Sequence, residues 1–571
     1  MTVAAEPELS AGSFLRSVLA SYRNMEMPAR RYGLFVVSPA LGFALLVILA
    51  TLFLPVPATI GLPLAVAGLF ATLVALAYPK VLEDRRRTQI DQRFHLFLTH
   101  ITVLSLTNID RIEVFRTLAA EEEYGPLADE MGRIVALVET WNQSLEDACR
   151  LRAKRVPSDL LADFLERLAY TVGAGQEVSE FLVSEQEGIV QQFSVRYEND
   201  LAKLDVMTEL YLSMMLAATF TLVFGLILPF LVGISPTLLL VAVISLFGIV
   251  QLSFLVLING ISPYDPVWYH PPDRPLDRRL RIYGSLAVGV VLTLFTSALA
   301  FAAFRGLTPI DPTELPLPVF VAVAFTPLVI PALVVRHEEG LVKRRDEDFP
   351  RFIRALGSVE SVKQSSTTNV LSTLRHKDFG ALTEGINRLY RRLFLRIDAT
   401  RAWRQFAADS GSWLIQKFAD MYVVGREMGG EPKHLGSLIS RNIRTLLTLR
   451  EQRQQATTTL VGIVYGISAA SVFAAYIGLE IVVMLIGVAE GIEIDDPMIS
   501  GLFNPELYSI PTIEALLLVV ILVNATLSAM MIRLTDRGRF LNALSHFVAL
   551  VWVGAIVATI TAVAVDALIV I

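Results

Sequence analysis

Long apolar runs alternate with long polar, charged stretches along this chain. Nine runs reach the roughly 20 residues that a helix needs to cross a hydrocarbon core of about 30 Å. They lie at 34–54, 57–78, 212–233, 237–259, 282–304, 316–335, 460–489, 513–532 and 547–571. Only helices and closed barrels satisfy their backbone in lipid, and these runs are too long and too apolar for barrel strands. The pattern therefore predicts an all-α polytopic membrane protein with about nine transmembrane helices.

Basic residues beside the runs predict the orientation. Four arginines between positions 16 and 31 precede the first run. A second apolar run follows the first one, in the place where a secretory signal peptide would have its cleavage site, so no such signal is predicted. The positive-inside rule then places the N-terminus in the cytoplasm. The loop 490–511 falls outside, and it has five acidic residues and no Lys or Arg. Nine spans place the C-terminal Ile571 outside.

Two polar blocks lie between the runs, at 91–211 and 346–459. Their apolar residues recur at helical spacing, so each block is predicted to be a helical bundle in the cytoplasm. Ser158 is the predicted N-cap of one helix. The last helix of each block, from about Val178 and from about Pro432, is predicted to continue into the next span.

These patterns divide the chain into eight parts. They are a cytoplasmic N-terminal segment (1–33), spans one and two (34–78), a first helical domain (79–211), spans three and four (212–259), a proline-rich cytoplasmic linker (260–281), spans five and six (282–335), a second helical domain (336–459) and spans seven to nine (460–571).

The two blocks align with each other and predict an internal duplication. Both open with Asp-x-x-Phe-x-x-Phe, at Asp91 and Asp346, an offset of 255 residues. Further on, a glycine-rich turn followed by glutamate recurs at Glu177 and Glu431, an offset of 254. Chance similarity between amphipathic helices is the alternative, and the matched distance between the two elements argues against it.

Composition agrees with a membrane protein and limits the chemistry. The 571 residues are 54% hydrophobic with a mean hydropathy of +0.55, against about 45–50% apolar in soluble domains. The single cysteine, Cys149, excludes an intramolecular disulfide and a thiolate metal cluster, and is predicted to be a small buried residue. The sequence has no P-loop, H-E-x-x-H or G-x-S-x-G motif. We therefore predict a non-enzymatic protein without cofactor, metal or nucleic-acid partner.

The net charge of −6 conceals a difference between the blocks. The first block has 11 basic and 22 acidic residues, and the second has 18 basic and 12 acidic. Six arginines gather within 17 positions of the second block: Arg388, Arg391, Arg392, Arg396, Arg401 and Arg404. They could form a solvated face, pair with the acidic first block, or dock an acidic partner surface.

Few polar residues interrupt the predicted spans. The ionisable ones are Glu480 and Asp566, and Gln251 and Asn524 are among the neutral ones. A carboxylate within a membrane span suggests a functional site, but contact with another helix or a position at the membrane surface also explains Glu480 and Asp566. A secondary transporter is therefore an alternative, although transporter repeats keep their polar residues at the midplane and here polarity lies in the blocks.

The paired Asp-x-x-Phe-x-x-Phe openings, the glycine-rich turns before Glu177 and Glu431, and the flanking span pairs together resemble the type II secretion F domain. The first block departs from the second in having His95 where the second has Pro350. A chain of this length with two such domains resembles the archaellum (archaeal flagellum) assembly membrane proteins, platform proteins of type IV pilus-like machines. The resemblance covers nearly the whole chain.

The resemblance implies a cell-membrane platform that couples a hexameric secretion-type ATPase to filament assembly and motility. Its implied partners are that ATPase, the filament subunits (archaellins), other cytoplasmic motor proteins and a second copy of the chain. It makes three basic clusters candidates for the ATPase contact: Arg85, Arg86 and Arg87; Lys343, Arg344 and Arg345; and Arg388, Arg391, Arg392 and Arg396. A platform for adhesive pili of the same superfamily is the nearest alternative.

Overall fold

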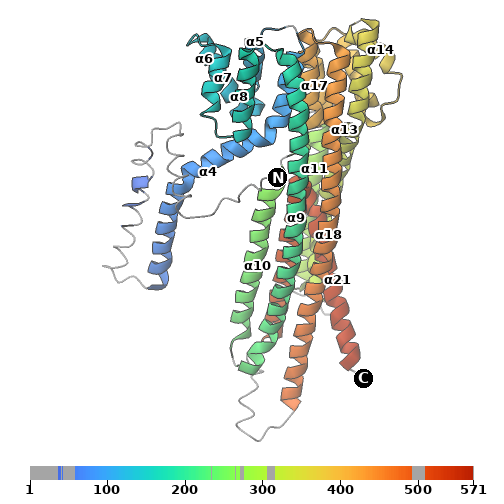
Figure 1. Ribbon diagram of the computed structural model, residues 1–571. Helices are drawn as coiled ribbons and strands as arrows, with labels where there is room; N and C mark the ends of the chain where they lie inside the picture. The colour runs from blue at the N-terminus through green and yellow to red at the C-terminus, as the bar shows by residue number, and fades with distance from the viewer. Residues whose placement is uncertain are drawn as a thin grey trace. The chain divides into compact units, whose positions relative to one another are not determined.

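The computed structural model describes residues 58–107, 109–232, 234–263, 265–269, 276–304, 316–364, 366–491 and 508–569, with a few positions between 32 and 45. These residues form helices, and the pairing of Trp268 with Ser412 is a lone antiparallel bridge among them. The predicted all-α fold is therefore confirmed. The chain divides into two units, Met1–Val190 and Gln191–Ile571 (Figure 1).

The first unit contains most of the first polar block. Its helices are α4 (Ala58–Ser105), α5 (Arg111–Ala120), η2 (Glu122–Tyr124), α6 (Pro126–Glu139), α7 (Leu145–Ala153), α8 (Asp159–Gly173) and the start of α9 (Val178–Val232). The ring of Phe94 meets Phe164 edge-on, and Phe97 meets Tyr124 in the same way. These fully buried rings join α4 to α8 and η2 and form the core of the block.

Local signals in the sequence explain the ends of these helices. The Ser158 hydroxyl accepts a hydrogen bond from the Leu161 amide, which confirms it as the N-cap of α8. Gly175 follows α8 with φ of +68°, a left-handed conformation that glycine adopts at little cost. Cys149 is buried, as predicted, and burial raises the pKa of its thiol to about 12.

The second unit contains the remaining helices. They are the rest of α9, α10 (Pro236–Ile261), α11 (Leu276–Phe304), α12 (Leu317–Phe325), η3 (Thr326–Leu328), α13 (Val329–Lys363), α14 (Thr367–Leu374), η4 (Gly380–Leu382), α15 (Thr383–Phe394), α16 (Ala399–Ser410), α17 (Trp413–Glu427), α18 (Pro432–Gly491), α20 (Ile510–Asp536), η6 (Phe540–Asn542) and α21 (Ala543–Ile569).

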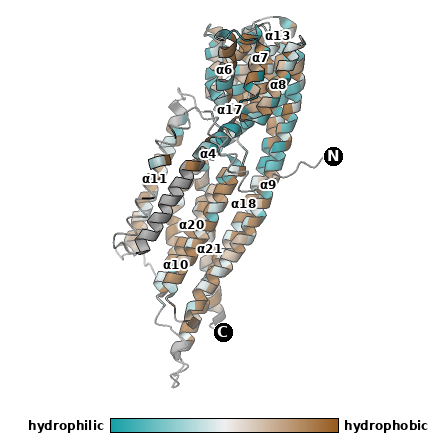
Figure 2. Cartoon of the chain, turned by 60° about the vertical axis from the view of Figure 1, so that its left-hand side comes forward, coloured by the Kyte–Doolittle hydropathy of each residue, from teal (hydrophilic) through white to brown (hydrophobic). Residues whose placement is uncertain are grey.

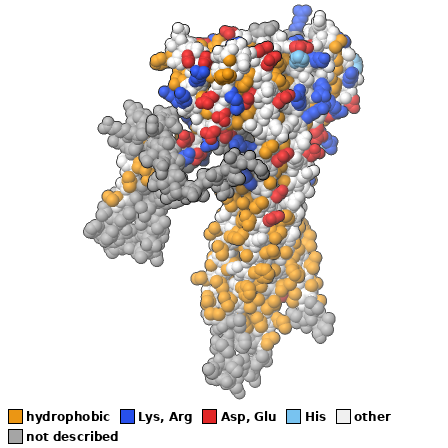
Figure 3. All heavy atoms as spheres, viewed as in Figure 1, with side chains coloured by type: hydrophobic (Ala, Val, Ile, Leu, Met, Phe, Trp, Pro, Cys, Tyr) orange, Lys and Arg blue, Asp and Glu red, His pale blue; other side chains and the backbone are white. Residues whose placement is uncertain are grey.

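Within the described residues, seven helical segments are long and apolar enough to cross a membrane. They contain predicted spans three to nine, and α10, α20 and α21 are brown along most of their length in Figure 2. Hydrophobic side chains cover the same part of the surface in Figure 3. The first predicted span lies almost wholly outside the described residues. The second falls in the first part of α4, where most side chains are also outside them.

Helices α9, α13 and α18 run without a break from apolar sequence into a polar block, as predicted for α9 and α18. The polar part of α13, from Arg336 to Lys363, contains 13 Asp, Glu, Lys or Arg residues and is too charged to lie in lipid. Helices α13, α17 and α18 pack against one another (Figure 1).

The two blocks contain the same elements in the same order: a long helix, a short helix, a 3-10 turn, three helices and a second long helix. Ser158 donates a hydrogen bond to Asp91 at 2.5 Å, and Ser412 donates the matching bond to Asp346. Phe352 meets Phe379 edge-on, as Phe97 meets Tyr124. These contacts repeat at offsets of 254 or 255 and support the predicted duplication.

Two helices add detail to the predicted linker and spans. Helix α11 begins at Leu276, after the last proline and within the predicted linker, and Arg281 pairs from this helix with Glu338 at 2.9 Å. The sixth predicted span consists of α12 and the start of α13, because Pro327 lies in the turn η3 that separates them.

Candidate functional site

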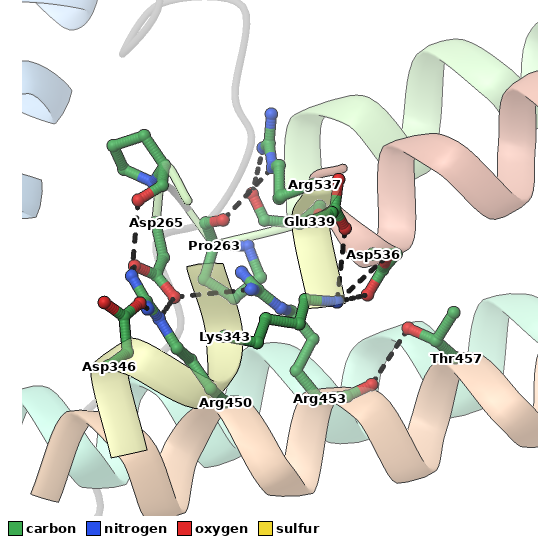
Figure 4. Close-up of polar contacts among 12 residues, drawn as sticks. Pro263, Asp265, Glu339, Lys343, Asp346, Arg450, Arg453, Thr457, Asp536 and Arg537 are labelled. Atoms are coloured by element: carbon green, nitrogen blue, oxygen red, sulfur yellow. Dashed lines mark hydrogen bonds and ion pairs between the residues drawn. The ribbon is translucent and has the colours of Figure 1, made fainter. Parts of the chain in front are cut away.

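A charge network lies where the second block joins the apolar helices of the same unit (Figure 4). Its centre is Arg450 of α18, whose side chain is 11% exposed. The guanidinium donates to both carboxylate oxygens of Asp265 at 2.7 Å and to Asp346 of α13 at 2.7 Å. Arg453, one turn further along α18, approaches Asp265 at 3.3 Å. Arg450 thus joins the linker between the two halves to α13.

Burial and charge oppose each other in this network. Burial raises the pKa of Asp346 to about 6, although Arg450 and the Ser412 hydroxyl both favour its ionised form. Burial alone would lower the pKa of Arg450, but Asp265 and Asp346 outweigh it and the net shift is upward. The arginine therefore stays charged, and it is the partner that keeps the Asp346 carboxylate ionised at neutral pH.

The Asp346 carboxylate also fixes the start of α17. It accepts a hydrogen bond from the Ser412 hydroxyl, which in turn accepts one from the Ile415 amide at 3.0 Å. One carboxylate therefore connects α13, α17 and α18. The aspartate that opens the repeated motif is a structural junction, not an exposed contact.

The linker residues 265–269 pack against the second block. Trp268 pairs with Ser412 through the antiparallel bridge, and its ring nitrogen donates to Glu339 at 3.1 Å. Glu339 also pairs with Lys343 at 3.3 Å and accepts from Asn542 at 2.7 Å. The linker is therefore docked on α13, α17 and the turn between α20 and α21.

A cavity of about 200 Å³ opens beside the network. Charged side chains from α13, α18 and α20 line it, among them Lys343, Asp346, Arg450 and Asp536. Among the described residues, no group of three or more His, Cys, Asp or Glu side chains is placed to hold a metal ion. The ion pairs beside this cavity thus hold the linker, α13, α18 and α20 together.

The predicted basic clusters are placed differently from one another. Arg87 pairs with Asp159 at 2.5 Å in the first unit, where Arg85 is exposed and Arg86 half-buried. In the second unit, Lys343 is part of the charge network. Arg345 donates to the Ser410 carbonyl at 2.9 Å, and its burial lowers its pKa.

The arginines of α15 divide into paired and exposed ones. Arg392 pairs with Asp409 of α16 at 2.8 Å, and Arg388 pairs with the same carboxylate at 3.3 Å. Arg391 and Arg396 are exposed, as is Arg344 on α13. Figure 3 shows basic side chains gathered over the part of the block near α14. An exposed basic surface therefore remains after the internal pairs are formed.

Polar residues buried in the apolar bundle also find partners. Gln251 of α10 donates to Asn524 of α20 at 2.8 Å, and Asn524 donates to Ser468 of α18 at 2.9 Å. Glu480 is half-buried, and the Asp566 side chain lies outside the described residues. The neutral polar residues thus connect α10, α18 and α20 and contribute to the packing of these helices.

Sequence reasoning did not find Asp265, Trp268 or Arg450. Asp346 was visible as the start of the repeated motif, but its partner Arg450 lies 104 residues away. An acidic and a basic residue this far apart in the sequence cannot be identified as a pair from their spacing.

Comparison with known proteins identifies one family model and two relatives that cover most of the chain. The family model described as "Type II secretion system (T2SS), protein F" matches residues 97–226. The chain is 34% identical to Flagella accessory protein J of Methanocaldococcus jannaschii over 93% of this chain and 94% of that protein. It is 32% identical to Flagella accessory protein J of Methanococcus voltae over 93% and 96%. No solved structure matches.

Proposed function

We propose that this chain, which belongs to the Flagella accessory protein J family, couples a cytoplasmic hexameric ATPase to an archaeal flagellar filament. The chain is a multi-pass membrane protein of the archaeal flagellar and type IV pilus-like platform class. In the proposed role its cytoplasmic blocks bind the ATPase and pass its motion to the filament subunits, for assembly and rotation. The N-terminus lies in the cytoplasm and the C-terminus outside.

The observation that carries this proposal is the continuity of α18. This helix has 60 residues, and at 1.5 Å per residue it is about 90 Å long. Its first part packs on α13 and α17, and its apolar part packs on α20 and α21. A force applied to the block would therefore reach the membrane bundle through one rigid element. The charge network around Arg450 is the point at which this helix is fixed to its neighbours.

The proposed ATPase contact uses the exposed basic residues. Reversing Arg392 would place two carboxylates together at Asp409, so a loss of binding there would also follow from local misfolding. Arg344 on α13 is exposed, and its charge can be reversed without breaking a described ion pair. We expect Arg344→Glu to lose co-purification of the ATPase while still inserting in the membrane. Arg444→Glu, the same change at an exposed site on α18, is the control.

The decisive experiment deletes the gene, restores it on a plasmid, and scores swimming and surface filaments. Loss of swimming and of flagellar filaments, with adhesive pili intact, supports the proposal. Loss of pili with swimming retained would assign the chain to the adhesive-pilus platforms. Survival of both filaments would refute a platform role and reopen transport as the function.

A further inference from the structure

The first polar block contains a cavity, and side chains fill the matching place in the second block. It has a volume of about 190 Å³ and is open on one side. Its walls are mostly apolar and come from α4, α5, α7, α8 and the start of α9. Ile101, Val114, Phe115 and Leu168 form buried parts of the wall, and Glu177 lies exposed at the mouth.

Larger side chains stand at three of the matching positions of the second block. Three residues lining the cavity are small or apolar: Ser105, Leu168 and Val172. At the offsets of the repeat, their counterparts are Glu360, Tyr422 and Arg426. Tyr422 donates to Glu360 at 2.6 Å and Arg426 donates to it at 3.2 Å. The second block thus fills with its own hydrogen-bonded side chains the place that the first block leaves open.

An open apolar cavity of this size can receive a large apolar side chain. A cavity of about 150 Å³ lined by Leu, Ile and Phe holds a benzene molecule. The cavity here is somewhat larger, so a phenyl ring fits within it. Such a ring would regain the van der Waals contacts that the unfilled walls lack.

The acidic residues around the cavity favour a basic binding partner. Between positions 91 and 190 the sequence has 18 acidic and nine basic residues. Near the mouth, Asp110, Glu177 and Glu180 are exposed beside a single arginine, Arg111. An apolar side chain carried on a positive surface would therefore match both the cavity and its rim.

The second block presents such a side chain. Phe394 ends α15 and is 66% exposed, and Leu395 after it is 72% exposed. Arg391 and Arg396 flank them and are exposed. We call Arg391 to Arg396 the basic apolar tip. Large exposed apolar residues rimmed by charge mark interaction sites.

The matching turn of the first block does not provide an equal tip. It exposes Trp141, but Leu137 and Asn142 stand where the second block has Arg391 and Arg396. This turn would therefore bring no positive charge to an acidic rim, and the place in the second block that matches the cavity is filled. The two blocks have therefore diverged into a receiving surface and an inserting surface.

We propose that the basic apolar tip of one chain inserts into the cavity of the first block of a second copy. Both blocks lie on the cytoplasmic side in the predicted topology, so the same contact forms twice about a two-fold axis. Each chain then gives one tip and receives one, the closed arrangement of a symmetric dimer.

Engineered cysteines in two differently tagged, co-expressed chains test this contact. One chain carries Leu395→Cys at the tip and the other carries Glu177→Cys at the cavity mouth. The native Cys149 is buried and does not compete. A disulfide between the two tags can form only between copies, so mild oxidation of membranes should give a covalent heterodimer.

Matched controls make the result specific. Val362→Cys, 85% exposed in the same block as the tip, should give at least tenfold less heterodimer. Val172→Phe in the receiving chain fills the cavity and should abolish the product, whereas Ala174→Phe, exposed beyond the lining, should leave it unchanged. Phe394→Ala in the inserting chain should lower the yield at least tenfold.

Four results would overturn the proposal. The first three are no heterodimer from chains that insert and accumulate normally, equal product from Val362→Cys, and product that survives Val172→Phe. A chain carrying both cysteines that forms only an intrachain bond would also overturn it, because the tip would then occupy its own cavity. The assay needs neither ATPase nor filament, so its failure is separate from failure of the proposed function.

Discussion

Replacing Arg450 by methionine tests whether the charge network fixes α18 to the second block. The change keeps about the length of the apolar stem but removes the guanidinium, which leaves Asp265 and Asp346 facing each other without their shared cation. Removing one partner of a buried ion pair costs about 3–5 kcal/mol, because the remaining charge is buried and uncompensated. Arg453 still reaches Asp265 at 3.3 Å, so we expect the lower end, about 3 kcal/mol.

Hydrogen exchange measures this cost in the intact membrane protein. The Ile415 amide bonds to Ser412, which Asp346 holds, and the Trp413 amide bonds to the Val267 carbonyl of the linker at 3.2 Å. A loss of about 3 kcal/mol corresponds to roughly 150-fold faster exchange at these amides. Full-length protein in nanodiscs, digested after labelling, reports both of them in one peptide.

A control and a double mutant separate the network from general damage. Arg444→Met, an exposed arginine on the same helix, should change exchange less than twofold. Asp346→Asn retains an oxygen that can accept from Arg450, so its cost should stay under about 1.5 kcal/mol. Combining it with Arg450→Met should cost less than the sum of the two changes. Unchanged exchange in Arg450→Met would refute the reasoning, and so would strict additivity.

Three further predictions use other parts of the structure. Gly357→Ala would place a methyl group against a backbone carbonyl of α18 and cost about 1–3 kcal/mol by exchange at the start of that helix, whereas Gly340→Ala in the same helix meets open space and should not destabilise it. Asn524→Leu removes the partner of Gln251 and should cost about 0.5–2 kcal/mol, seen as a lower thermal midpoint in detergent than that of the unchanged chain. Because the folded pKa of Asp346 is about 6, above the ordinary 3.8, the folded chain binds more protons between about pH 4 and pH 6. The contribution of this group to stability should therefore fall as the pH rises through that window, and Asp346→Asn should flatten the pH dependence of the thermal midpoint there; a steeper dependence in the variant would contradict the sign.

The sequence predicted the features that depend on neighbours along the chain. Apolar runs of span length, the N-cap Ser158 and the glycine turn at 175 are local signals, and the helices follow them. The order of elements in the two blocks could be anticipated from Asp91 and Asp346, because the motif recurs with its distances preserved. Local rules sufficed because helix formation is decided over a few turns.

The candidate site depended on contacts that no local pattern encodes. Arg392 looked like part of an open basic face, yet Asp409 of the next helix pairs with it. Asp265 lies in a proline-rich stretch read as a simple linker, but 185 residues separate it from Arg450. Such pairs are set by how helices pack, and the polar residues alone do not specify which will meet.

The packing of the first and last helices of each block shows how one framework permits two roles. At Gly357 a side chain would overlap the Pro432 carbonyl, so α13 and α18 approach at a distance that only glycine permits. The matching residue of α4 is Thr102, whose hydroxyl donates to the Leu182 carbonyl of α9 at 3.2 Å. A threonine there holds the helices apart by the width of its side chain, which gives the first block room for a cavity. Both blocks thus keep the repeated motif. Other residues, such as Thr102 and Gly357, decide which block contains the cavity and which block provides the inserting tip.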